Sequence, residues 1–188
     1  EEGWVSYLYY DVEKQRDAVG RIDTRDPDLA PRDGRTFFYR GKLLLTSMSH
    51  LRIARSTDGR NFSFGPRPAI SPTEHYETYG CEDARITELD GTYWIAYTAV
   101  SPAGVTVALA STRDFRKYEK HGVILPTHNK DACIFPRKVG GMYVCRHRPF
   151  FTQFNDACIW TARSPDLLAW GHHEMTLAPT PGTWEAQR

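Results

Sequence analysis

An internal repeat is the feature that most limits what this 188-residue chain can fold into. Three segments carry a serine, an aspartate two or three positions later, and an aromatic residue four positions after that aspartate. They are STDGRNF at 56–62, STRDFRKY at 111–118 and SPDLLAW at 164–170. The three serines are 55 and 53 residues apart. A period near 50 residues, built from short strands, is typical of the blades of a β-propeller.

Short runs rich in β-branched and aromatic residues surround each repeat. LRIA, VTVALA and ACIWTA precede the serines, and GKLLLTSM, GTYWIAYTAV and GGMYVCRH lie further upstream. Runs of this kind, bounded by Gly and Asp turns, predict strands, and the chain shows no helical stripe of apolar residues. We therefore predict an all-β fold with blades at about 35–80, 81–128 and 129–188. Residues 1–34 are expected to form one N-terminal strand and a charged connecting segment.

Composition excludes several classes of partner. Lys and Arg total 24 against 23 Asp and Glu, so the net charge of +1 gives no overall field for nucleic acid or an anionic membrane. No apolar run approaches the roughly 20 residues that cross a bilayer, and the acidic N-terminus lacks the cationic start of a signal peptide. The four cysteines show no C-x-x-C spacing, and a chain of this size does not need disulfides for stability, which favours reduced thiols over disulfides. We expect a soluble, cytoplasmic protein without a bound metal.

Aspartates recur near the starts of the predicted innermost strands. Asp28, Asp83 and Asp131 are 55 and 48 residues apart. Because innermost propeller strands surround one central channel, these acids are expected to converge on one polar cavity. Asp83 lies in the segment YGCEDARIT, where Glu82 and Arg85 flank it. One acid beside a guanidinium is a combination that catalysis can use.

The aspartates inside the repeated segments have a different expected role. Asp58, Asp114 and Asp166 follow a hydroxyl residue in a turn, where an aspartate usually accepts hydrogen bonds from turn amides. We therefore predict a structural role for all three, and a position near a ligand for Asp58 alone.

Several segments resemble the signature segments of glycoside hydrolase family 130. They are SHLRIARSTDGRNF, GCEDARIT, VALASTRDF, NKDACIFPRKVGGMYVCRHRP and the terminal W-x-x-x-R, and the resemblance covers about residues 35–188. That family consists of five-bladed β-propellers acting on β-mannosides. Most members are phosphorylases that use inorganic phosphate and invert the anomeric centre to give α-mannose 1-phosphate, and a minority are hydrolases. The resemblance implies that this chain covers about three of five blades.

The resemblance also assigns roles to individual residues. Asp83 falls at the position of the catalytic acid, and Lys130 and Arg137 are the implied phosphate contacts. The implied substrate contacts are Ser49, Arg55, Asp58, Glu82, Arg85, Asp131, His147 and Arg148. No organic cofactor or metal is implied, phosphate is the expected co-substrate, and a manno-oligosaccharide is the expected substrate.

Two alternatives remain open. Thr106 stands where family members often carry an arginine that contacts phosphate, which keeps a phosphate-independent β-mannoside hydrolase under consideration. A hydrolase needs two carboxylates facing the substrate, and Asp28, Asp83 and Asp131 could supply them. A non-catalytic carbohydrate-binding propeller is less favoured, because such a protein has no evident use for the acid and its arginine. The sequence leaves the linkage, the acceptor sugar and homo-oligomerisation open.

Overall fold

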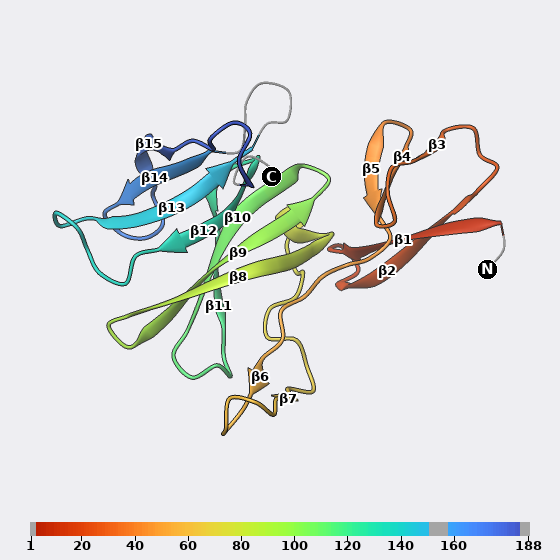
Figure 1. Ribbon diagram of the computed structural model, residues 1–188. Helices are drawn as coiled ribbons and strands as arrows, with labels where there is room; N and C mark the ends of the chain where they lie inside the picture. The colour runs from red at the N-terminus through yellow and green to blue at the C-terminus, as the bar shows by residue number, and fades with distance from the viewer. Residues whose placement is uncertain (1–2, 151–157, 185–188) are drawn as a thin grey trace. The chain divides into compact units, whose positions relative to one another are not determined.

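The computed structural model describes residues 3–150 and 158–184 (Figure 1). Strands dominate this part of the chain, and its one helical element is a 3-10 turn at His75–Glu77. The predicted all-β fold is therefore confirmed. None of the described helical residues forms a segment long and apolar enough to cross a membrane. The chain divides into two compact units, one of residues 1–82 with 99–103 and one of residues 83–98 with 104–188.

The first unit begins with a β-hairpin. Strand β1 (Trp4–Asp11) pairs antiparallel with β2 (Arg16–Asp23) in unbroken register. Tyr7 lies opposite Gly20, and a Cβ atom added at Gly20 would come within 2.0 Å of the Tyr7 ring. Only a glycine leaves room for that ring. Further strands are β3 (Leu29–Pro31), β4 (Thr36–Tyr39) and β5 (Lys42–Leu45), which form one sheet, and the short hairpin of β6 (Ala54–Arg55) and β7 (Ser63–Phe64).

The N-terminal segment differs from its sequence prediction. One strand and a charged connecting segment were expected over residues 1–34, but β2 and β3 also lie there. The physical reason is exposure: the charged residues of β2 lie mostly on its solvent side, whereas Ile22 is buried. When one face of a strand is in water, charged residues can occupy the positions on that face. The composition of the strand then resembles that of a loop.

Two four-stranded sheets make up most of the second unit. The first contains β8 (Gly80–Leu89), β9 (Thr92–Ser101), β10 (Gly104–Thr112) and β11 (Glu119–Leu125). The second contains β12 (Asn129–Ile134), β13 (Tyr143–Pro149), β14 (Ile159–Ser164) and β15 (Gly171–Leu177). In both sheets each strand pairs with the next along the chain, as in propeller blades. The count of five blades stays a prediction.

The two sheets lie side by side and share one hydrophobic core (Figure 1). Val107 and Leu109 of β10 meet Ile134 of β12 and Ala162 of β14 in this core, and each is at most 2% exposed. Burying a Val, Leu or Ile side chain contributes about 1.5–3 kcal/mol, so this core fixes the two sheets against each other. It thereby holds the starts of the innermost strands in place.

The repeated segments form the same turn three times. In each turn, two backbone amides donate to a hydroxyl oxygen and the next two donate to Oδ1 of the aspartate. The hydroxyl and carboxylate pairs are Ser56 with Asp58, Thr112 with Asp114, and Ser164 with Asp166. These amides hold the pKa of all three carboxyl groups below the ordinary value. The structural role predicted for these aspartates is confirmed.

One position of the repeat needs correction. The sequence pattern assigned Ser111 to the turn, but Thr112 makes the turn hydrogen bonds, and Ser111 Oγ lies 2.8 Å from His121 Nε2. The spacing between the hydroxyl residue and the aspartate is therefore two residues in all three turns. The residue after each aspartate has a left-handed backbone, with φ of 70° at Gly59, 54° at Phe115 and 72° at Leu167.

Candidate active site

Two aspartates share an unusual backbone geometry near the starts of β8 and β12, the first strands of the two four-stranded sheets. Asp83 of β8 and Asp131 of β12 have φ values of 54° and 57°, and each is followed by alanine. The register between β12 and β13 shifts between Lys130 and Cys133, so Asp131 lies in a β-bulge. Aspartate adopts this left-handed region more readily than most residues, and bulges redirect side chains. Backbone of this kind is concentrated at functional sites, which makes both aspartates candidates.

A cation accompanies each of these two carboxylates. Lys130 Nζ lies 3.6 Å from Asp83 Oδ2, and the Asp83 side chain remains 48% exposed. Arg148 holds Asp131 more tightly, because its Nη2 and Nε lie 2.6 and 2.8 Å from Asp131 Oδ2. The Asp131 side chain is 28% exposed. The geometry therefore pairs one accessible, loosely held acid with one carboxylate that is fixed in direction.

Glu82 has its own set of partners within the first unit. Arg35 Nη2 and Ser49 Oγ lie 3.0 and 3.4 Å from Glu82 Oε2. The Cys81 amide donates to the Ser49 carbonyl, and a Cβ atom at Gly80 would come within 2.1 Å of Ser49 Oγ. The structure thus brings Ser49 and Glu82 together. Arg35 was missed by the sequence reasoning, because it lies 47 residues from Glu82 and outside every quoted motif.

The side chains of His147 and Arg148 lie in different surroundings, although the two residues are neighbours in the chain. Successive strand residues point to opposite faces of the sheet, so Arg148 reaches Asp131 while His147 faces the interior. His147 is 3% exposed, its Nδ1 lies 2.9 Å from the Asn129 amide nitrogen, and its Nε2 lies 3.2 Å from His173 Nδ1. Burial lowers the pKa of His147 to about 4. It is a neutral, hydrogen-bonded side chain at pH 7.

The other residues implied by the resemblance are exposed or hydrogen-bonded within their own turn. Arg55 lies exposed in β6, and the carboxylate of Asp58 accepts bonds from its own turn and from the Asn61 side chain. Arg85 is exposed on β8. Arg137 is exposed and lies three residues beyond the end of β12 at Ile134.

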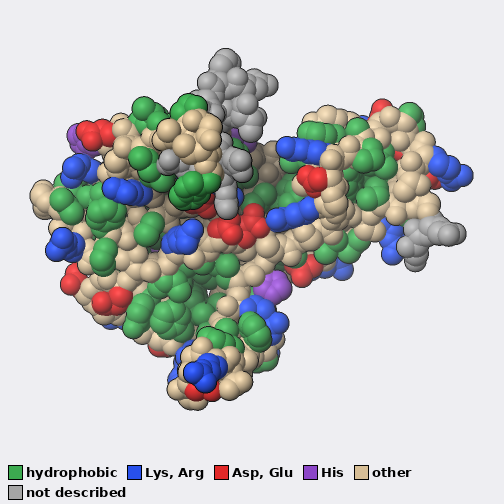
Figure 2. All heavy atoms as spheres, viewed as in Figure 1, with side chains coloured by type: hydrophobic (Ala, Val, Ile, Leu, Met, Phe, Trp, Pro, Cys, Tyr) green, Lys and Arg blue, Asp and Glu red, His purple; other side chains and the backbone are tan. Residues whose placement is uncertain are grey.

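The structure also shows the positions of Asp28 and Thr106, two residues on which the hydrolase alternative drew. Asp28 precedes β3 and pairs with Arg40 Nε at 3.1 Å within the first unit. Thr106 of β10 is 7% exposed. Among the described residues, no cluster of His, Cys, Asp and Glu has the arrangement of a metal site. Acidic and basic side chains are interspersed over the face shown in Figure 2, as the near-zero net charge would suggest.

Comparison with known proteins agrees with the resemblance in the sequence. A family model described as beta-1,4-mannooligosaccharide phosphorylase, that of glycoside hydrolase family 130, matches residues 34–187. A beta-1,2-mannobiose phosphorylase of Listeria innocua is 43% identical over 144 residues, which are 77% of this chain and 41% of that protein. A 1,2-beta-oligomannan phosphorylase of Thermoanaerobacter sp. is 38% identical over 144 residues, which are 75% of this chain and 47% of that protein.

A solved structure of a beta-1,2-mannobiose phosphorylase from Listeria innocua, in complex with beta-1,2-mannobiose, superimposes with a TM-score of 0.93 at 36% identity. The alignment covers 100% of this chain and 54% of that structure. The chain thus spans about half the length of the relatives that it matches. The family model covers most of the chain, and two relatives exceed 30% identity over three quarters of it. The chain belongs to glycoside hydrolase family 130.

Proposed function

We propose that the protein containing this chain cleaves β-mannosidic bonds by inverting phosphorolysis, which yields α-mannose 1-phosphate. The observation that carries this proposal is the accessible Asp83, in a left-handed backbone conformation, with Lys130 Nζ at 3.6 Å. This pair supplies one acid from the start of β8 and one cation from the start of β12. The relatives named as mannoside phosphorylases support the same reaction.

The proposed reaction needs only one protein acid. Asp83 gives its proton to the leaving glycosidic oxygen, directly or through a sugar hydroxyl, while a phosphate oxygen attacks C1 from the opposite face. The C1–O bond to the leaving sugar breaks as the bond from C1 to phosphate forms, which inverts the anomeric centre. Phosphate is already anionic, so no second carboxylate has to activate it.

The two cations have separate proposed roles. Lys130 stabilises the carboxylate that Asp83 becomes after proton transfer, and it attracts the incoming phosphate. Arg148 fixes Asp131, whose free carboxylate lone pairs then accept hydroxyl groups of the bound sugar. The proposed role of Ser49 and Glu82, which lie in the first unit, is to bind the substrate. Arg148 is held by two short contacts with Asp131 Oδ2, whereas Lys130 lies 3.6 Å from Asp83 Oδ2, so Arg148 is assigned to orientation and Lys130 to phosphate.

The substrate is proposed to contain β-1,2-linked mannose. This choice follows the Listeria innocua and Thermoanaerobacter relatives, whose names specify 1,2 linkages. A phosphate-independent hydrolase is the second candidate, and the observation that favours it is Thr106, which is buried in β10 and cannot contact phosphate as an arginine does.

The deciding experiment compares the products with and without inorganic phosphate. The full-length protein is incubated with β-1,2-mannobiose, and the products are identified by NMR. Mannose 1-phosphate formed only with phosphate is the expected result. Free mannose released at a phosphate-independent rate would overturn phosphorolysis in favour of hydrolysis. The variant Asp83→Asn should lose either activity, which confirms that the products come from this site.

A further inference from the structure

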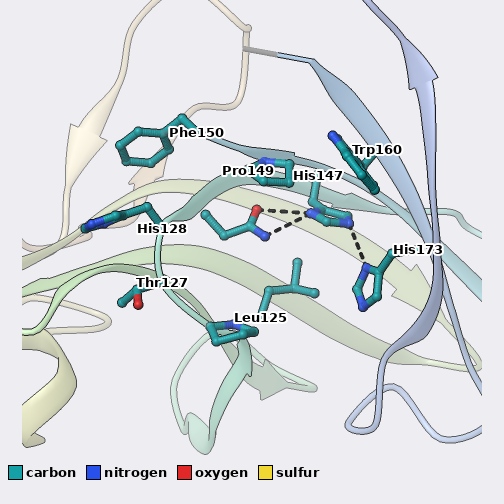
Figure 3. A pocket seen from close by; sticks show the side chains of 10 residues that line it. Leu125, Thr127, His128, His147, Pro149, Phe150, Trp160 and His173 are labelled. Atoms are coloured by element: carbon teal, nitrogen blue, oxygen red, sulfur yellow. Dashed lines mark hydrogen bonds between the residues drawn. The ribbon is translucent and has the colours of Figure 1, made fainter. Parts of the chain in front are cut away.

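A cavity of about 380 Å³ lies at the end of the second sheet of the second unit, where β12 begins and β13 ends (Figure 3). Asn129 pairs there with Pro149 across the two strands. The size falls within the roughly 300–1,000 Å³ of pockets that hold small molecules. The roles proposed above for Asp83, Lys130, Asp131 and Arg148 do not use this cavity, whereas His147, one of the implied substrate contacts, lines it.

Aromatic rings form much of its wall. Figure 3 shows His128 and Phe150 on one side of the cavity and Trp160 on the other. The rings of His128 and Phe150 lie 5.5 Å apart at an angle of 37°. One face of a pyranose ring consists of C–H groups, and aromatic side chains are the usual surface on which such a face packs. The wall is therefore suited to the apolar face of a sugar.

Polar groups interrupt this wall at a few positions. Asn129, His147 and His173 form a continuous hydrogen-bonded row along the cavity. The indole Nε1 of Trp160 is buried and has no hydrogen-bond partner in the part of the chain that the structure describes. Because the Trp160 side chain lines the cavity, a ligand bound there would change the surroundings of this N–H group. A few fixed polar groups in an apolar wall are what orients a hydroxylated ligand.

The cavity favours an uncharged ligand. Its described lining contains no Asp, Glu, Lys or Arg side chain. Its central histidine, His147, is neutral at pH 7 because burial lowers its pKa. Phosphate and sugar phosphates need cations to replace their hydration, so this lining would bind them poorly.

We infer that this cavity binds a neutral pyranose ring at a second sugar site, separate from the bond that is cleaved. Asn129 directly precedes Lys130, and successive strand residues point to opposite faces, so the cavity and the Lys130–Asp83 pair lie on opposite sides of β12. A ring in the cavity is therefore not the ring that Asp83 serves. That this pyranose is mannose, free or as a further unit of the oligosaccharide, rests on the proposed function.

The test is an NMR titration of the tryptophan indole N–H signals of the full-length protein. The variant Trp160→Phe assigns the Trp160 signal by its disappearance. Mannose is expected to shift this signal in a saturable way, whereas inorganic phosphate does not. The Trp170 signal is the internal control, because its Nε1 already donates to the Leu167 carbonyl and lies outside the cavity. An unchanged Trp160 signal at mannose concentrations that inhibit the enzyme, or a shift caused by phosphate instead, would overturn the inference.

Kinetics with Phe150→Ala then distinguish the two sources of the ring. If the cavity holds a further unit of the substrate, this variant should lose roughly tenfold in kcat/KM for β-1,2-mannotriose and keep its value for β-1,2-mannobiose. An equal kcat/KM ratio, with the mannose shift still present in the wild type, assigns the site to free sugar. Absence of any phosphorolysis would defeat the proposed function, while the titration would still report on the cavity.

Discussion

The turn aspartates and the strand aspartates recur with the same period, but their carboxylates have opposite surroundings. In the turns, Oδ1 of Asp166 accepts the amides of Leu168 and Ala169, so the backbone satisfies the charge. At the strand starts, Asp83 and Asp131 meet only the cationic side chains of Lys130 and Arg148 among the partners described. A carboxylate held by backbone amides stabilises a loop, whereas one that faces a side-chain cation stays available for chemistry.

The backbone differs between the two regions as well. In the turns, the left-handed residue is the one after the aspartate, and glycine occupies that position in one turn of three. At the strand starts, the left-handed residue is the aspartate itself. In the turns the aspartate keeps an ordinary backbone conformation. At the strand starts the aspartate itself has the strained conformation, which sets the direction of its side chain. Recurrence of an aspartate therefore does not identify a site, and a left-handed aspartate is only one indication of it, since Asp90 in the turn between β8 and β9 also has a φ of 50°.

The largest effect that tests this comparison is expected at Asp83. Asp83→Asn removes the proton but keeps the shape, so kcat for β-1,2-mannobiose should fall by about 10²–10⁴. Because Asp83 is half exposed, the melting temperature should stay close to that of the wild type. The matched turn variant Asp166→Asn should retain kcat per folded molecule. Near-normal turnover of Asp83→Asn would refute its assignment as the acid.

A smaller loss is expected at Arg148. The two contacts of its guanidinium group with Asp131 Oδ2 fix the direction of that carboxylate, and lysine has no second donor in the same plane. Arg148→Lys should lower kcat/KM by roughly tenfold, mainly through KM, because sugar orientation and not proton transfer is affected. The exposed Arg116→Lys is the control and should change neither constant. A loss in kcat alone would place Arg148 in the chemical step.

Much of the fold could be predicted from residue patterns, because strands and turns are local. Alternating β-branched residues gave the strands, and the hydroxyl and aspartate pairs gave the turns. The choice between Ser111 and Thr112 could not be made, since adjacent hydroxyls look alike until the hydrogen bonds are known. Strand β2 was missed because charges on its exposed side imitate a loop.

The site was less predictable, because its members meet across long separations in sequence. Asp83 came from a family motif, but its left-handed backbone has no signature in sequence. The pairing of Arg35 with Glu82 lies within no motif. One feature could have been found by counting residues along β13: the alternation that directs His147 and Arg148 to opposite faces of the sheet.

A stability effect without loss of chemistry is expected in the turns. Asp166→Ala removes the acceptor for two backbone amides, so the melting temperature should fall while kcat per folded molecule is kept. The amides lower the pKa of Asp166 in the folded state, so this stabilisation is present above the unfolded pKa near 3.9 and is lost as pH falls through the folded value. Denaturant unfolding at pH 7 and pH 3 should therefore show a wild-type advantage that shrinks in acid. An advantage that is equal at both pH values would contradict the carboxylate mechanism.

The smallest effect is expected from His147. The pH range in which it changes the stability of the fold differs from that of the turn aspartates. Burial lowers its folded pKa to about 4, whereas an unfolded histidine titrates near 6.5. The unfolded state therefore binds more protons between these values, so stability is full above pH 6.5 and declines as pH falls toward 4. His147→Gln should remove this slope from unfolding curves measured at pH 7, 5.5 and 4.5. The exposed His75→Gln is the control, and a similar loss of slope in that variant would show that burial at β13 is not the cause.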